Sequence, residues 1–121
     1  MMVLVDTSVW ITHLREGNEK LATLLDRGEV LCHPFIIGEL ACGTIRNRKE
    51  IVSLLQLLPV VIPANHEEVM GFIDMNRLMG KGLGYIDMCL LASARLTGIP
   101  VWTFDKKLDE TANELRIRYD E

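Results

Sequence analysis

Four carboxylates stand where the surrounding residues predict either an apolar core or the end of a strand. They are Asp6, Glu39, Asp87 and Asp105, which we call the carboxylate quartet. An ionised carboxylate among apolar neighbours is costly unless it is paired or bound to a cation. Carboxylate oxygens are the ligands that hard ions such as Mg²⁺ and Mn²⁺ prefer in proteins. The quartet therefore predicts a site for a divalent cation.

A cluster of carboxylates also narrows the chemistry that such a site performs. Two unit charges about 4 Å apart repel by about 4 kcal/mol at an effective dielectric constant of about 20, so a cluster needs bound cations or raised pKa values. A bound divalent ion lowers the pKa of its water, orients a phosphodiester and stabilises charge on the attacking and leaving oxygens. We therefore expect hydrolytic cleavage of a nucleic acid.

The sequence around each carboxylate indicates the element that would position it. Asp6 and Asp105 each close an apolar, β-rich run and so mark the carboxyl ends of two strands. Glu39 and Asp87 lie within predicted helices, where their neighbours at helical spacing are uncharged. In parallel sheets ligands bind beyond the carboxyl ends of the strands. The four acids are therefore expected to converge on one edge of a sheet.

Each acid also has a purely structural interpretation. The two strand-end acids precede predicted helices and could be N-caps, and Asp87 in a first helical turn could complement the helix dipole. Glu39 lies in mid-helix and is no cap, so it would need an ion-pair partner such as Arg46 or Arg48.

Length and composition are those of one ordinary globular domain, residues 1–121. The chain has 121 residues, of which 49% are hydrophobic and 25% charged. Its 13 basic and 17 acidic residues give a net charge of −4. The excess of acids equals the size of the quartet, so the rest of the surface is balanced. The acidic charge therefore does not exclude a nucleic acid as partner.

Nothing in the sequence indicates a membrane protein or a disulfide framework. No apolar stretch approaches the roughly 20 residues of a membrane span, and the first residues lack the basic start and cleavage site of a signal peptide. We expect a cytoplasmic protein without membrane contact. Cys32, Cys42 and Cys89 have apolar neighbours and no CxxC spacing, and are interpreted as reduced core thiols.

Short apolar strands alternate with helical segments, which predicts an α/β domain with a parallel sheet flanked by helices. The Gly80–Gly84 loop is interpreted as a lid or a turn. Strands are expected at 2–6, 29–33, 59–62, 100–104 and 115–118, and helices at 7–15, 18–27, 34–43, 47–57, 65–80, 84–97 and 106–113.

Three groups of basic residues adjoin the predicted site segments. Contacts from such residues to phosphates would give sequence-independent, salt-dependent affinity for RNA, although solvated surface charge explains them equally well. The groups are Arg46, Arg48 and Lys49, then Arg77 and Lys81 at i,i+4 spacing, then Lys106 and Lys107.

The order and spacing of these segments resemble a known family. The segments are Asp6-Thr7-Ser8 after the first strand, Ile37-Gly-Glu39-Leu on a helix, Tyr85-Ile-Asp87 followed by Leu91-Ala-Ser-Ala94, and Thr103-Phe-Asp105-Lys. Together they are similar to the PIN-domain ribonucleases, and within them to the VapC toxins of toxin–antitoxin pairs. The resemblance implies a three-layer α/β/α PIN-like domain with a central, mainly parallel sheet of four to five strands.

The resemblance also implies the activity and the roles of single residues. It implies a Mg²⁺- or Mn²⁺-dependent endoribonuclease that leaves a 5′-phosphate, is usually a homodimer, and is covered by a VapB-type antitoxin. Asp6 and Asp87 would be the principal metal ligands, with Glu39 and Asp105 completing the site directly or through water. Hydroxyls of Thr7 or Ser8 and of Thr103 would orient a carboxylate or a metal-bound water.

Two positions near the fourth motif need separate interpretation. Asp109 lies one helical turn beyond Asp105 and is interpreted as a surface residue rather than a peripheral ligand. Many relatives carry a basic residue directly after the strand threonine, whereas here Phe104 separates Thr103 from Asp105. Substrate contacts at Phe104 are therefore left open.

Three other functions compete with this interpretation. An aspartyl-phosphate enzyme would need a second Asp at position 8, which is Ser, and a receiver domain would need an acidic pair beside Asp6. A catalytically silent binding module would not need all four carboxylates. A PIN-domain nuclease that processes RNA without an antitoxin fits the same residues and stays open as an alternative.

Overall fold

The computed structural model, which describes residues 1–120, has a parallel sheet of three strands at its centre. These are β1 (Val3–Val5), β2 (Val30–Leu31) and β3 (Val101–Trp102), in the order β2-β1-β3. Leu4 of β1 lies opposite Leu31 on one side and Val101 on the other. Because β1 is the central strand and all three run parallel, their carboxyl ends meet at one edge of the sheet.

The predicted outer strands at 59–62 and 115–118 are only single parallel bridges. Val60 pairs with Cys32 beside β2, and Arg118 pairs with Val101 beside β3. Pro59 and Pro63 bracket the first segment and cannot donate to a ladder, and Arg116 adopts a left-handed φ of 61° in the second. The predicted number of strands, four to five, is therefore higher than the three found in residues 1–120. The parallel α/β architecture is confirmed.

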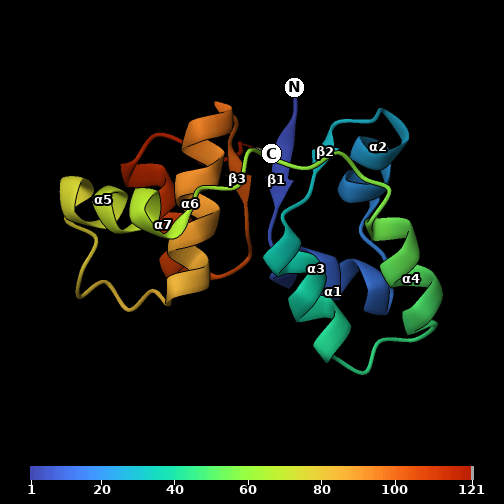
Figure 1. The fold of residues 1–121 in the computed structure, drawn as a ribbon. Coiled ribbons are helices and arrows are strands. Elements are labelled where there is room, and N and C mark those ends of the chain that lie inside the picture. The colour runs from blue at the N-terminus through green and yellow to red at the C-terminus, as the bar shows by residue number, and fades with distance from the viewer. Residues whose placement is uncertain (121) are drawn as a thin grey trace.

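Within residues 1–120, seven helices cover the sheet. In Figure 1 they form two groups, with α1 to α4 on one side of the strands and α5 to α7 on the other. Within these groups α1 packs on α3, α3 on α4, and α5 on α6. The helices are α1 (Thr7–Glu16), α2 (Glu19–Asp26), α3 (Pro34–Cys42), α4 (Arg48–Leu55), α5 (His66–Asn76), α6 (Tyr85–Thr97) and α7 (Lys106–Glu114).

Helix α5 is shorter than the helix predicted at 65–80. It ends at Asn76 because Arg77 adopts the left-handed conformation with φ 53°. The backbone N–H of Arg77 donates to the carbonyls of Ile73 and Asp74 and closes the helix. Arg77 and Lys81 therefore do not share a helix, although they remain four residues apart in the sequence.

The core surrounds the sheet and includes buried residues of all seven described helices. All three residues of β1 are fully buried, and α6 has a continuous buried run from Met88 to Ala94. Both tryptophans, Trp10 and Trp102, belong to the core. Residues 1–120 contain no helix that is both long and apolar enough to cross a membrane.

The prediction that all three cysteines are core thiols is wrong at one position. Cys32 and Cys89 are buried, whereas Cys42 is exposed. Cys42 is the last residue of α3, where the helix has passed the edge of the core.

Candidate active site

Asp6 lies at the centre of a hydrogen-bond network at the carboxyl edge of the sheet. It is only 7% exposed, and its backbone N–H donates to the carbonyl of Trp102 in the neighbouring strand. Its Oδ2 accepts bonds from the hydroxyls of Ser8 at 2.8 Å and Thr103 at 2.7 Å, and from the Ser8 N–H at 3.4 Å. Asp6 is therefore both the N-cap of α1 and a rigidly held carboxylate.

Thr103 joins the two strand-end acids. Its hydroxyl donates to Asp6 and accepts the backbone N–H of Asp105 at 3.0 Å. Asp105 in turn caps α7, because its Oδ1 accepts the N–H of Leu108 at 2.9 Å. One side chain at the end of β3 thus fixes both acids relative to each other.

Glu39 is tied to the start of α1. Its Oε1 accepts a hydrogen bond of 2.7 Å from the hydroxyl of Thr7, which is 32 residues away in the sequence. The predicted ion pair with Arg46 or Arg48 does not form within residues 1–120, and the Nε of Arg48 donates instead to the carbonyl of Ala41.

Asp87 is the half-buried member of the quartet and lies in the first turn of α6. Its Oδ2 accepts the N–H of Gly84 at 3.1 Å, so it also completes the helix start. Burial raises its pKa above the ordinary value, the bond from Gly84 lowers it, and the charges of the other three carboxylates raise it further. The other three acids therefore lie within electrostatic range of Asp87.

Each carboxylate of the quartet uses one oxygen to hold the fold. That oxygen is Oδ2 of Asp6, Oε1 of Glu39, Oδ2 of Asp87 and Oδ1 of Asp105. The second oxygen of each accepts no hydrogen bond from residues 1–120. The cap interpretation and the ligand interpretation are therefore compatible, since fixing one oxygen leaves the other available.

No cation of the protein neutralises the quartet in the described part of the chain. The ion pairs there join Lys81 to Glu114, Arg118 to Asp109, and the N-terminus to Glu29. The quartet is also graded in exposure: Asp6 is buried, Asp87 intermediate, and the two others exposed. Uncompensated charge that reaches from the core to solvent attracts an external cation.

The donor set fits a hard divalent ion held mainly by water. In residues 1–120 no three His, Cys, Asp or Glu side chains are arranged as a group that could hold a metal ion by themselves. Mg²⁺ commonly binds through one or two carboxylates, several waters and substrate phosphates rather than in a protein cage. The free oxygens of Asp6 and Asp87 suit that mode of binding.

The remaining predicted residues are placed as follows. Asp109 pairs with Arg118 at 3.0 Å, which agrees with a surface role. Lys81 pairs with Glu114 at 2.9 Å, and Lys107 folds over Gly82, so the loop before Asp87 is tied to α7 as a turn. These two lysines are engaged within the protein, in contrast to the exposed Lys106, which has no ion pair within the described chain.

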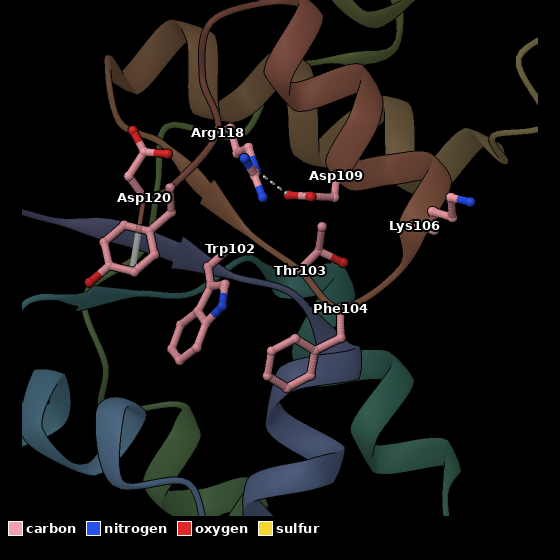
Figure 2. Close-up of a pocket in the computed structure, with 8 residues that line it drawn as sticks. Trp102, Thr103, Phe104, Lys106, Asp109, Arg118 and Asp120 are labelled. Atoms are coloured by element: carbon pink, nitrogen blue, oxygen red, sulfur yellow. Dashed lines mark hydrogen bonds and ion pairs between the residues drawn. The ribbon is translucent and has the colours of Figure 1, made fainter.

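The sequence did not predict a cavity of about 520 Å³ on the other side of Thr103. We call it the aromatic groove (Figure 2). It is lined by Trp102, Thr103, Phe104, Lys106, Asp109, Arg118, Tyr119 and Asp120. Its far wall comes from the last residues of the chain, which reach it through the single bridge between Arg118 and Val101. The only signal in the sequence was the unusual Phe104 between Thr103 and Asp105.

Comparison with known proteins decides the family. The PIN domain family matches residues 3–114. The chain is also 44% identical over 114 residues to Ribonuclease VapC32 of Mycobacterium tuberculosis, in strains CDC 1551/Oshkosh and ATCC 25618/H37Rv, covering 93% of this chain and 92% of the relative. The chain is a PIN-domain protein of the VapC type. The resemblance inferred from the four motifs is thereby confirmed.

A solved structure supports the same PIN fold. The crystal structure of FitAcB from Neisseria gonorrhoeae superposes with a TM-score of 0.61 at 20% identity, covering 93% of this chain and 94% of that chain. At this identity the likeness concerns the fold alone. In this chain the strand ends gather side chains from distant parts of the sequence, as the hydrogen bond from Thr103 to Asp6 shows.

Proposed function

We propose that this PIN-domain chain is a Mg²⁺- or Mn²⁺-dependent endoribonuclease and the toxin of a toxin–antitoxin pair. The observation that carries the proposal is the quartet itself, four mutually repelling carboxylates at the sheet edge, each with one oxygen free. The name of the relative, Ribonuclease VapC32, supports RNA as the substrate. It favours the toxin over an RNA-processing nuclease without an antitoxin or a silent binding module.

Asp6 and Asp87 are assigned as the principal ligands of the cation. Asp6 is held by two hydroxyls and cannot turn away. The pKa of Asp87 is raised by burial and also by the negative charges of the other three carboxylates, and a bound cation would relieve that repulsion. Glu39 and Asp105, at the exposed rim, complete the site directly or through water. A bound divalent ion supplies Lewis-acid activation of water and neutralises charge on the cleaved phosphate.

The hydroxyls of the chain have positioning roles in this proposal. Ser8 and Thr103 fix the carboxylate plane of Asp6, and Thr7 fixes Glu39. Because these hydroxyls donate to carboxylate oxygens, they fix the orientation of Asp6 and Glu39. The chain thus prepares the site before cation and RNA arrive, which lowers the reorganisation needed during cleavage.

A VapB-type antitoxin and a homodimer are proposed as partners, and the cytoplasm as the place of action. Coexpression with the product of the adjacent small gene should yield a stable complex that no longer cleaves RNA. Light scattering of the free protein should give twice the mass of one chain. A monomer, or a chain that no neighbouring product inhibits, would contradict these two assignments separately.

The decisive experiment is incubation of the purified protein with total cellular RNA, followed by mapping of the cut ends. We expect cleavage with 5′-phosphate ends in Mg²⁺ or Mn²⁺, none in EDTA, and recovery when the cation is returned. Cleavage that continues undiminished in EDTA would refute the metal assignment. Asp26→Asn, an exposed aspartate at the end of α2, serves as a control that should cleave normally.

A further inference from the structure

The aromatic groove begins where the carboxylate site ends. Thr103 belongs to both, because its hydroxyl bonds to Asp6 while the residue also lines the groove. When the cleaved phosphate of an RNA strand lies at the quartet, an adjacent nucleotide of the same strand therefore lies at the opening of the groove. The inference that follows rests on the proposed nuclease function.

Phe104 presents an aromatic ring at the mouth of the groove. It is 47% exposed although it lies only two residues beyond the buried strand β3. Its backbone N–H donates to the Ser8 hydroxyl at 2.9 Å, and its ring packs edge-on against the buried Trp102 with 5.8 Å between centroids. These two contacts hold the ring in place beside Trp102 (Figure 2), and the ring keeps an exposed surface.

The charges of the groove differ from those of the quartet. The lining includes two basic side chains, Arg118 and Lys106, and two acidic ones, Asp109 and Asp120, so it is formally neutral. Asp109 is already paired with Arg118. Lys106 is exposed, has no ion pair within residues 1–120, and lies two residues from Phe104. A neutral, partly aromatic groove with this exposed Lys106 does not repel a phosphate. The quartet without a metal would repel it.

We propose that the aromatic groove is a nucleotide subsite, in which a base flanking the cleaved phosphodiester stacks on Phe104 and a phosphate contacts Lys106. Exposed aromatic side chains are the usual platforms for unpaired bases in RNA recognition. A groove of about 520 Å³ is large enough for one nucleotide. The subsite selects single-stranded RNA, because a base within a duplex cannot stack on the ring.

The test measures binding in a protein that cannot cleave. In an Asp6→Asn background, the affinity for a short single-stranded RNA that spans a mapped cut site is measured by fluorescence anisotropy. We expect Phe104→Ala to weaken binding about 10-fold and Phe104→Trp to restore it. Leu57→Ala removes another exposed apolar side chain, and is the matched control with unchanged affinity.

RNA with a single abasic position identifies the stacked base. One abasic position beside the cut should weaken binding of the RNA to the protein that keeps Phe104. With that RNA, the protein that keeps Phe104 and the Phe104→Ala variant should have the same affinity. Equal affinities with and without the Phe104→Ala substitution, or an advantage that persists at every abasic position, would overturn the subsite. The subsite would also be overturned if Phe104→Ala weakened binding of the antitoxin and left binding of RNA unchanged. The groove would then be a contact for a protein.

The two proposals fail in distinguishable ways. If the unaltered protein binds RNA through Phe104 but does not cleave it with Mg²⁺ or Mn²⁺, the nuclease function is wrong and the subsite stands as a binding site. If the protein cleaves RNA and Phe104→Ala changes neither affinity nor the base preference of the mapped cuts, only the subsite is wrong.

Discussion

The carboxylate quartet and the aromatic groove meet at the segment from Thr103 to Asp105 but differ in charge. The quartet gathers charge of one sign and leaves it without a cation from the described part of the chain, whereas the groove pairs Asp109 with Arg118 and adds an exposed ring. The difference teaches that the two tasks of a nuclease need different surfaces. Activation of water needs uncompensated carboxylates, and holding a polyanion needs a surface that does not repel it.

The largest effect is expected from removing a charge of the quartet. Asp6→Asn and Asp87→Asn should each reduce RNA cleavage by more than about 100-fold, because each removes an assigned cation ligand. The amide oxygen of Asn still accepts the capping bonds, so circular dichroism and Tm should report an intact fold. Normal cleavage by either variant would show that the quartet is only a set of helix caps.

A smaller loss is expected at the residue shared by both regions. Thr103→Val keeps the shape of the side chain but removes the hydroxyl that holds Asp6 and accepts the N–H of Asp105. We expect cleavage to fall about 10-fold, the usual range for a residue that orients a metal ligand. Thr111→Val, at another buried threonine, is the control that should retain activity. A larger loss at Thr111 than at Thr103 would contradict the shared role.

The pH dependence of stability tests the repulsion within the quartet. The pKa of Asp87 is raised in the folded protein, so this carboxyl favours folding when protonated and disfavours it when ionised. Without divalent ions, Asp87→Asn should therefore raise Tm at neutral pH, and the gain should vanish as the pH falls below the ordinary pKa of Asp. A change of about 0.5 kcal/mol corresponds to roughly 2–3 °C in a domain of this size.

Cation addition gives the second arm of that test. Mg²⁺ or Mn²⁺ should stabilise the unaltered protein more than the Asp87→Asn variant, because the variant has lost one assigned ligand and one of the charges whose repulsion the cation relieves. Equal stabilisation of both would separate Asp87 from the cation site.

The smallest effect is expected at Asp109. Asp109→Asn breaks an exposed ion pair with Arg118, and such pairs contribute at most about 1 kcal/mol to stability. At saturating RNA the cleavage rate should stay within about two-fold, in contrast to Asp105→Asn four residues earlier. A loss as large as that of the quartet variants would move Asp109 from the groove into the metal site.

The sequence was sufficient to predict the quartet because its members sit at the ends of predictable elements. An apolar run that stops at Asp6 or before Asp105 marks a strand end, and parallel strands bring such ends together. Glu39 stood out as a charge in mid-helix, although its actual partner, Thr7, could not be chosen over an arginine by spacing. That choice depends on the packing of α1 on α3, which no local pattern encodes.

The groove and the weak outer strands were beyond the reach of local patterns. Arg118 and Tyr119 meet Phe104 only through one bridge to β3, and a single bridge leaves no periodicity in the sequence. Helix α5 was predicted too long because the apolar spacing continues past Asn76, while the left-handed turn at Arg77 has no glycine to announce it. The missed features are thus those fixed by tertiary contacts.

The strand order has a consequence for the cell that makes the protein. Residues 3–5 form the middle strand, and one of its two neighbours is formed by residues 101 and 102. A ribosome must therefore release at least the stretch from Val3 to Asp105 before Asp6 can meet Thr103 and Asp105. A polypeptide that stops before residue 101 lacks β3 and Thr103, and so cannot hold Asp6 as the folded protein does.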